Sequence, residues 1–135
     1  MYQQMIFVNL ATTDLDASKR FFTELGYTIN AQFSDDSTAS IPLSDTIVVM
    51  LHTPAKYRQF TQKDIVDSRK HSEVLLALSA ESREKVDELV EKAVAAGGSV
   101  TGETQDHGFM YGRAFDDVDG HTWEVVWMDP AAVQG

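Results

Sequence analysis

The organisation of the chain is clearest in one segment near its C-terminus, Asp116-Asp117-Val118-Asp119-Gly120-His121-Thr122-Trp123-Glu124-Val125-Val126-Trp127. Its first half predicts a tight turn, because Asp side chains bond to nearby backbone and Gly120 accepts a positive φ. Its second half alternates like a β-strand, with Trp123 and Trp127 on one face and Glu124 on the other. The tryptophans indicate a core face. Glu124 therefore projects from the opposite face, where a carboxylate needs a cation, a hydrogen-bond donor or water.

Composition limits the classes of function. The 135 residues are long enough for one domain with a hydrophobic core, and the formal net charge of −10 disfavours nucleic acids and anionic membrane surfaces as partners. The absence of cysteine excludes disulfides, thiol nucleophiles and Cys-ligated zinc. We see no signal peptide and no apolar run approaching the roughly 20 residues of a membrane span, so a cytoplasmic location is expected.

Apolar runs and turn residues predict a sequence of short elements. Asp14 and Ser82 are candidate N-caps for two amphipathic helices, which are expected to end at Gly26 and at Gly97-Gly98. The predicted strands are 5–10, 27–34, 38–43, 46–52, 74–80, 99–104, 110–116 and 122–128.

These elements form a repeat. Each half runs strand, cap, helix, glycine and then three strands, and Phe7 precedes Asp14 by the same seven residues that separate Leu75 from Ser82. The prediction is an α+β fold of two βαβββ modules, about 1–52 and about 73–130, within a single domain of 1–135. A linker of about 53–72, with one or two helical turns, would join them. The alternative is a generic α+β domain whose repetition is accidental.

The motif Asp117-x-Asp119-Gly120-His121-x-Trp123-Glu124 resembles the last strand of the vicinal-oxygen-chelate superfamily, which includes glyoxalase I, extradiol dioxygenases and bleomycin-resistance proteins. The opening Phe7-Val8-Asn9-Leu10, followed by Asp14-Leu15 and Leu25-Gly26-Tyr27, is similar to the strand and helix that begin those proteins. The resemblance implies that the two modules curl their sheets into a cup around a ligand cavity. It also implies a homodimer.

The same resemblance implies four metal-ligand positions, which fall here on Phe7, Met50, Leu75 and Glu124. Phe and Leu carry no donor atom, and the Met thioether suits soft ions, so only Glu124 can bind a hard or borderline divalent metal. We therefore expect neither the usual metal site nor another cofactor.

Several further side chains are candidates for ligand contacts. His52 shares strand parity with Met50 and could line the cavity as a base or a ligand contact, although a solvated histidine at the strand end is the simpler interpretation. Asn9 shares parity with Phe7 and could donate to a ligand or satisfy backbone. Tyr111 could stack on a planar ligand. Arg113 could bind an anionic group, or pair with Glu124 or with the acidic turn.

Two functions remain. The first is a small-molecule-binding protein similar to the bleomycin-resistance branch, holding a small organic ligand around Glu124 without a divalent metal. The alternative is a lyase- or dioxygenase-type enzyme of the same superfamily, with Glu124 as an acid/base or as a metal ligand. A structural adaptor is a third possibility. The sequence leaves open whether the chain catalyses any reaction, because a shared fold does not determine a function.

Overall fold

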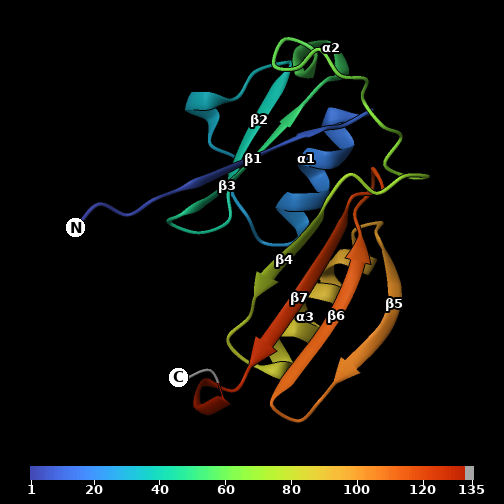
Figure 1. Ribbon diagram of the computed structural model, residues 1–135. Coiled ribbons are helices and arrows are strands. Elements are labelled where there is room, and N and C mark those ends of the chain that lie inside the picture. Colours follow the sequence, from blue (N-terminus) through green and yellow to red (C-terminus); the bar gives the residue numbers. More distant parts are fainter. Residues whose placement is uncertain (133–135) are drawn as a thin grey trace. The chain divides into compact units, whose positions relative to one another are not determined.

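The computed structural model describes residues 1–132 (Figure 1). The chain forms two compact units, Met1–Val66 and Asp67–Gly135. The boundary between these units falls inside the segment predicted as a linker. That segment contains the short helix α2 (Pro54–Tyr57), which begins where the Thr53 side chain accepts a hydrogen bond from the Lys56 N–H. Within residues 1–132, none of the helices has both the length and the apolar character needed to cross a bilayer.

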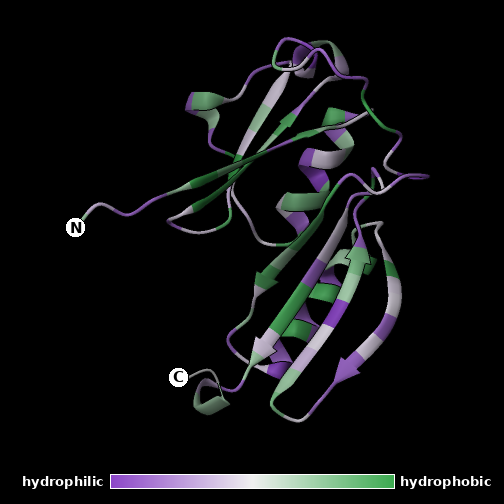
Figure 2. Ribbon diagram, viewed as in Figure 1, coloured by the Kyte–Doolittle hydropathy of each residue, from purple (hydrophilic) through white to green (hydrophobic). Residues whose placement is uncertain are grey.

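Unit one is a three-stranded sheet covered by a helix. Its strands β1 (Ile6–Ala11), β2 (Thr38–Pro42) and β3 (Ile47–His52) lie in the order β1-β3-β2. The β1–β3 pair is parallel and the β2–β3 pair is antiparallel. Hydrophobic residues run along much of β1 and β3 (Figure 2), as is typical of strands that pair in parallel.

Helix α1 (Leu15–Glu24) forms where the sequence predicts it. The Asp14 side chain accepts a hydrogen bond from the Ala17 N–H at 3.0 Å, which satisfies one of the free donors of the first turn. The apolar stripe of the helix is buried, and so are the strand residues of one sheet face. The buried residues of this core include Leu15, Phe21, Phe22, Leu10, Ile41, Val49 and Leu51.

One predicted strand of unit one is wrong. Residues 27–34 contain no strand, and Ala31–Phe33 form a 3₁₀ turn. The Asn30 side chain accepts a hydrogen bond from the Gln32 N–H at 3.1 Å, and the Asn30 N–H donates to the Ser40 carbonyl at 2.8 Å. Such local bonds offer the backbone an alternative to a sheet ladder. The first module therefore has three strands instead of the predicted four.

Unit two has the complete βαβββ order. It contains β4 (Leu75–Ser79), α3 (Arg83–Ala95), β5 (Ser99–Asp106), β6 (Met110–Asp116) and β7 (Thr122–Met128). The sheet order is β4-β7-β6-β5, with β4 and β7 parallel. The register between β5 and β6 shifts between Thr101 and Gln105, and such an irregularity bends a strand. The two sheets together confirm the predicted α+β fold.

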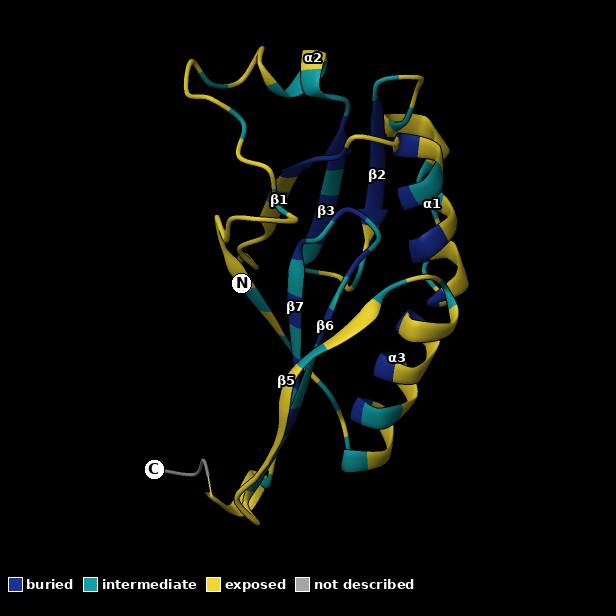
Figure 3. Ribbon diagram, turned by 90° about the vertical axis from the view of Figure 1, so that its right-hand side faces the viewer, coloured by how far each residue is buried: buried dark blue, intermediate teal, exposed yellow. Residues whose placement is uncertain are grey.

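The core of unit two lies between the sheet and α3. Ser82 caps this helix by accepting from the Lys85 N–H at 3.1 Å. Val86, Val90 and Ala93 are fully buried. In Figure 3 the buried segments of α3 lie on the side of the helix that faces the strands of unit two. Trp123 and Val125 supply the opposite half of this core. The prediction that Trp123 marks the core face of the last strand is confirmed.

Candidate ligand-binding faces

Glu124 lies on the sheet face of unit two that turns away from α3. The strand register places Ala77, Glu124, Ala114 and Thr101 in one row across four strands. Glu124 lines a groove of about 330 Å³ and is half-buried. Within residues 1–132, no side chain or backbone group forms a hydrogen bond or an ion pair with the Glu124 carboxylate. The carboxylate is therefore available to a ligand.

Small residues shape the floor of this groove. Gly112 and Ala114 of β6 lie opposite Val126 and Glu124 of β7. A Cβ atom added at Gly112 would lie 3.6 Å from the Val126 side chain, in ordinary van der Waals contact. The remaining lining comes from the bent strand β5, from Met110 and from Arg113. A ligand of modest size can therefore approach the carboxylate along an apolar floor.

Leu75 shares the Glu124 face. It pairs with Thr122 two residues before Ala77 pairs with Glu124, and its side chain is 59% exposed. This placement agrees with the position that the sequence resemblance implies for it. A leucine this exposed contributes apolar surface but no ligand atom.

Tyr111 and Arg113 lie on the other face of β6, toward α3. The Tyr111 hydroxyl donates to Asp87 Oδ1 at 2.7 Å, and Arg113 donates to the same oxygen at 3.0 Å. The hydrogen bond from Tyr111, followed by the contact with Arg113, lowers the pKa of Asp87. The partner of Arg113 is thus Asp87, instead of the Glu124 or the acidic turn considered from sequence. The predicted ligand role of Tyr111 would need a ligand on the helix side of the sheet, whereas Arg113 also lines the Glu124 groove.

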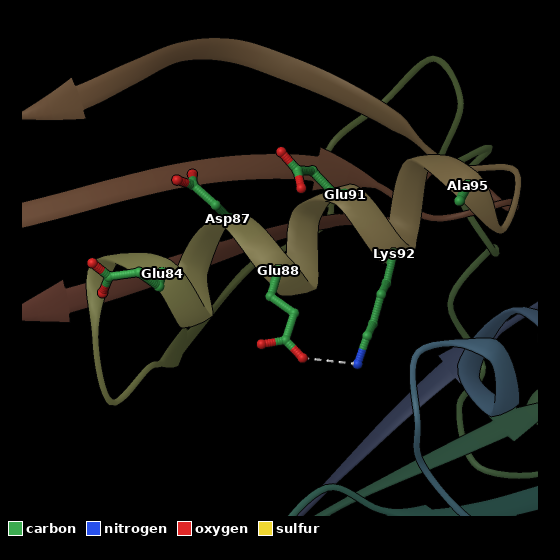
Figure 4. A pocket seen from close by; sticks show the side chains of 6 residues that line it. All are labelled: Glu84, Asp87, Glu88, Glu91, Lys92 and Ala95. Atoms are coloured by element: carbon green, nitrogen blue, oxygen red, sulfur yellow. Dashed lines mark ion pairs between the residues drawn. The ribbon is translucent and has the colours of Figure 1, made fainter.

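A hollow of about 580 Å³ follows the outer surface of α3 near Asp87. Figure 4 shows carboxylates along this helix, with Glu88 paired to Lys92 at 3.2 Å. The residues that line it are Glu84, Asp87, Glu88, Glu91, Lys92 and Ala95. All of these residues belong to one acidic helix, and acidic side chains along one helix do not by themselves form a ligand site.

Unit one offers a second sheet face. The register pairs Phe7 with Val48, Asn9 with Met50 and Ala11 with His52, so Phe7, Asn9, Met50 and His52 share the face away from α1. Phe7 and Met50 line a groove of about 610 Å³. The predicted parities of Asn9 with Phe7 and of His52 with Met50 agree with this register, and the ligand roles of the four residues stay a prediction.

His52 is buried, with only 2% of its surface exposed, so the expectation of a solvated strand end is wrong. Its Nε2 lies 2.8 Å from Asn9 Oδ1 and its Nδ1 lies 2.9 Å from the Thr38 hydroxyl. Because Oδ1 can only accept, Nε2 carries the proton and Nδ1 accepts from Thr38. Burial lowers the pKa of His52, and the nearby Lys56 charge adds to this effect. The Phe60 ring lies 5.1 Å from the imidazole, centroid to centroid.

The acidic turn before β7 is a structural element of unit two. Asp117 is buried and accepts hydrogen bonds from the His121 N–H at 3.0 Å and from Trp123 Nε1 at 3.0 Å. Burial raises the pKa of Asp117. His121 Nδ1 lies 2.8 Å from Glu73 Oε1, within ion-pair distance. Gly120 has a φ of +91°, as its predicted role in the turn requires.

Of the residues that line the unit-one groove, the sequence analysis named Phe7 and Met50 and missed the others, which are Met5, Asn30, Phe33, Ser40, Pro42, Ser44, Asp45 and Val48. Strand alternation could have found Ser40, because it lies opposite Met50 across the β2–β3 pair. Asn30 and Phe33 lie in the segment that was wrongly predicted as a strand, so strand alternation could not place their side chains on the correct side of the sheet.

The family of the chain follows from direct comparison. Residues 4–125 match the family model described as the Glyoxalase/Bleomycin resistance protein/Dioxygenase superfamily. The chain belongs to this superfamily. The vicinal-oxygen-chelate resemblance read from the sequence is thereby confirmed.

Several solved structures share this fold. A hypothetical protein from S. aureus, SA1046, is 31% identical with a TM-score of 0.77, over 94% of this chain and 94% of that chain. A glyoxalase-related enzyme from Fulvimarina pelagi is 25% identical with a TM-score of 0.76, over 93% and 88% respectively. The fosfomycin resistance protein FosX from Listeria monocytogenes, 20% identical with a TM-score of 0.65 over 94% and 92%, shares the fold alone. No curated protein matches this chain in sequence.

The donor atoms of this superfamily member do not suit the divalent metal of its metal-dependent relatives. Of the four implied positions, Phe7 and Leu75 offer no donor atom and Met50 offers only a thioether. Among residues 1–132, no group of three or more His, Asp or Glu side chains is arranged to hold a metal ion. The residues present therefore do not fit the divalent metal.

Proposed function

We propose that this chain is a cytoplasmic small-molecule-binding protein of the glyoxalase/bleomycin-resistance type, which holds its ligand against the Glu124 face without the usual divalent metal. The observation that carries the proposal is the Glu124 carboxylate. It lies in a groove of about 330 Å³, half-buried and without a partner among residues 1–132.

The chemistry of the groove defines the kind of ligand. An ionised carboxylate only accepts hydrogen bonds, so the ligand should present an N–H or O–H group, or a cationic group, to Glu124. Charge-assisted hydrogen bonds of this kind are stronger than neutral ones. The apolar floor of Gly112, Ala114 and Val126 suits an organic body next to that donor.

The proposal is tested by screening small organic compounds by thermal shift against the metal-free chain, and then repeating each hit with Glu124→Gln. The matched control is Glu91→Gln, because Glu91 is exposed on α3. We expect Glu124→Gln to weaken binding about tenfold or more, the effect of losing one charge-assisted hydrogen bond, and Glu91→Gln to leave it unchanged. Equal affinity for both variants and the native chain would overturn the proposal.

An enzyme is the second candidate, and the unpartnered Glu124 carboxylate is the observation that favours it. A carboxylate without a structural partner is available to move a proton on a bound substrate. Fosfomycin is a first substrate to test, because a fosfomycin resistance protein shares the fold. Incubation with the chain, followed by ³¹P NMR, would support an enzyme if turnover appears and Glu124→Gln removes it.

We also propose that the chain forms a homodimer. Edge strands β1 and β4 carry large exposed apolar side chains, with Phe7 at 56% and Leu75 at 59% exposure. Exposed apolar residues on an unpaired strand edge favour association with another chain.

A further inference from the structure

We propose that Arg83, the first residue of α3, is a positioning residue of the Glu124 groove. It holds the end of strand β5, which supplies one side of that groove, from the opposite face of the sheet. The inference rests on the proposed function in taking the groove as the ligand site. All of the residues that it uses lie in unit two.

Strand β5 is paired irregularly along its middle. It stands at the edge of the four-stranded sheet, next to β6. Between the pairs Thr101–Ala114 and Gln105–Gly112, β5 advances four residues while β6 advances two. Residues 102–104 therefore lie outside the regular ladder, and all three are exposed. Extra residues of this kind disrupt the local pairing and bend the strand.

The irregular segment borders the Glu124 groove. Gly102 and Glu103 line the groove, together with Thr101 and Gln105 on either side of them. Gly102 has a φ of +70°, and a Cβ atom added there would have no neighbour within 4 Å. Because little packs against this segment, its position depends on the anchors at its two ends.

Arg83 anchors the C-terminal end of β5. Its Nη1 and Nη2 each donate to one oxygen of the Asp106 carboxylate at 2.9 Å, and Nη2 also donates to the Gly108 carbonyl at 2.9 Å. Its guanidinium carbon lies 5.1 Å from the centroid of the Tyr111 ring and 5.2 Å from that of the Trp127 ring. A planar guanidinium can form two parallel hydrogen bonds and stack on aromatic rings at the same time. One side chain thus joins α3 to strands β5, β6 and β7.

The anchor reaches the groove through strand alternation. Asp106 pairs with Tyr111, which lies on the helix side, and its neighbour Gln105 pairs with Gly112 on the groove side. Since neighbouring residues of a strand point to opposite faces, fixing Asp106 also fixes the part of the groove that Gln105 supplies. The hydrogen bonds from Arg83 lower the pKa of Asp106 to about 2, so this carboxylate stays charged at neutral and moderately acidic pH.

The first test measures amide hydrogen exchange of the ¹⁵N-labelled full chain by NMR. The His107 N–H donates to the Met110 carbonyl at 2.9 Å, so its exchange reports the opening of the hairpin next to Asp106. Arg83→Glu places a like charge beside Asp106, and a glutamate suits the first turn of a helix, so α3 should stay folded. We expect the His107 amide to exchange about tenfold faster, from the loss of the ion pair and of the ring contacts.

Three comparisons make this result specific. Lys85→Glu is the matched control, because Lys85 is exposed on the same helix and the change of charge is the same. The Ala80 N–H, which donates to a carbonyl of β7 at 2.8 Å, should exchange at its native rate in both variants. Adding Asp106→Arg to Arg83→Glu restores an ion pair with its charges exchanged, and should slow the exchange of His107 again by about threefold.

The second test asks whether this side of the groove affects binding. The probe is benzylamine, whose ammonium group can donate to Glu124 while its ring lies on the apolar floor of the groove. In NMR titrations we expect Arg83→Glu to weaken benzylamine about threefold relative to Lys85→Glu, because the ligand must then order the side of the groove itself. Glu124→Gln, titrated in parallel, reports on the proposed function.

The outcomes separate the two claims. Equal exchange of the His107 amide in Arg83→Glu and Lys85→Glu would overturn the inference. Faster exchange with the same benzylamine affinity in both variants would also overturn it, because the Arg83 contacts would then be structural only. Benzylamine binding that Glu124→Gln leaves unchanged would overturn the proposed function alone. If the native chain does not bind benzylamine, a cationic ligand of this kind is excluded, and the exchange rates decide the role of Arg83 by themselves.

Discussion

His52 Nε2 lies 2.8 Å from Asn9 Oδ1, across the parallel pair of strands β3 and β1. The contact fixes the tautomer of a buried imidazole and orients an amide on the open face of the sheet. The other ring nitrogen of His52, Nδ1, lies 2.9 Å from the Thr38 hydroxyl. The histidine therefore joins all three strands of unit one.

Replacing this histidine should destabilise the protein. His52→Ala leaves a cavity and an unpaired Thr38 hydroxyl, so we expect the free energy of unfolding to fall by about 2 to 4 kcal/mol. Urea denaturation followed by tryptophan fluorescence measures the change. His71→Ala is the control because His71 is exposed, and its effect should stay within about 0.5 kcal/mol. Similar stability for the two variants would contradict the structural role of His52.

The same residue predicts a pH dependence. The pKa of His52 is lowered from its ordinary value of 6.5, first by burial. The unfolded chain therefore takes up this proton at a higher pH than the folded chain does. The contribution of His52 to stability is complete above the unfolded pKa and decreases as the pH falls below it. Urea denaturation at pH 7.5 and pH 5.5 should show lower stability at the acidic value. His52→Gln should reduce that difference, and an unchanged difference would count against the burial of His52.

Gly120 should be intolerant of a side chain. Its φ is +91°, and a Cβ atom there would lie 2.8 Å from the Arg69 Cα, a backbone atom that cannot move cheaply. Gly108 is the matched control, since its φ is +82° with open space around it. Gly108→Ala should cost about 1 kcal/mol from backbone strain, and Gly120→Ala about 1 to 3 kcal/mol more from the clash. Equal losses of unfolding free energy would show that the Arg69 backbone can move aside.

Tyr111 should stabilise unit two through Asp87. Tyr111→Phe removes the 2.7 Å hydrogen bond to a partly exposed carboxylate, so we expect a loss of about 0.5 to 1.5 kcal/mol in urea denaturation. Because this bond is the largest cause of the low pKa of Asp87, the variant should also raise that pKa, measurable by carboxyl ¹³C NMR. Tyr2→Phe, at an exposed position, should change neither quantity. An unshifted Asp87 titration in Tyr111→Phe would refute the contact.

The proposed dimer can be measured directly. Sedimentation equilibrium should give twice the 15.0 kDa mass of one chain. Leu75→Lys should shift the protein toward the monomer, because it places a charge on the exposed apolar edge of β4. Val94→Lys, at an exposed position of α3, should not. A monomer at all concentrations would rule out the dimer.

Much of the fold could be predicted because strong local patterns coincide with the elements that form. The predicted ranges 110–116 and 122–128 are the observed bounds of β6 and β7, where alternation and the flanking turns agree. The strand predicted over residues 27–34 is wrong because the Asn30 side chain accepts a hydrogen bond from the Gln32 N–H, which favours a 3₁₀ turn. A single side chain there outweighed a weak strand pattern.

The sequence by itself determined that Glu124 and Trp123 lie on opposite faces, because side chains of an extended chain alternate whatever surrounds them. It also determined that Phe7 and Leu75 cannot ligate a metal, since their side chains hold no donor atom. Only the tertiary structure decided that Arg113 pairs with Asp87 and that His52 is buried against Asn9. Each of these depends on distances between segments far apart in the chain, which packing establishes and local patterns do not encode.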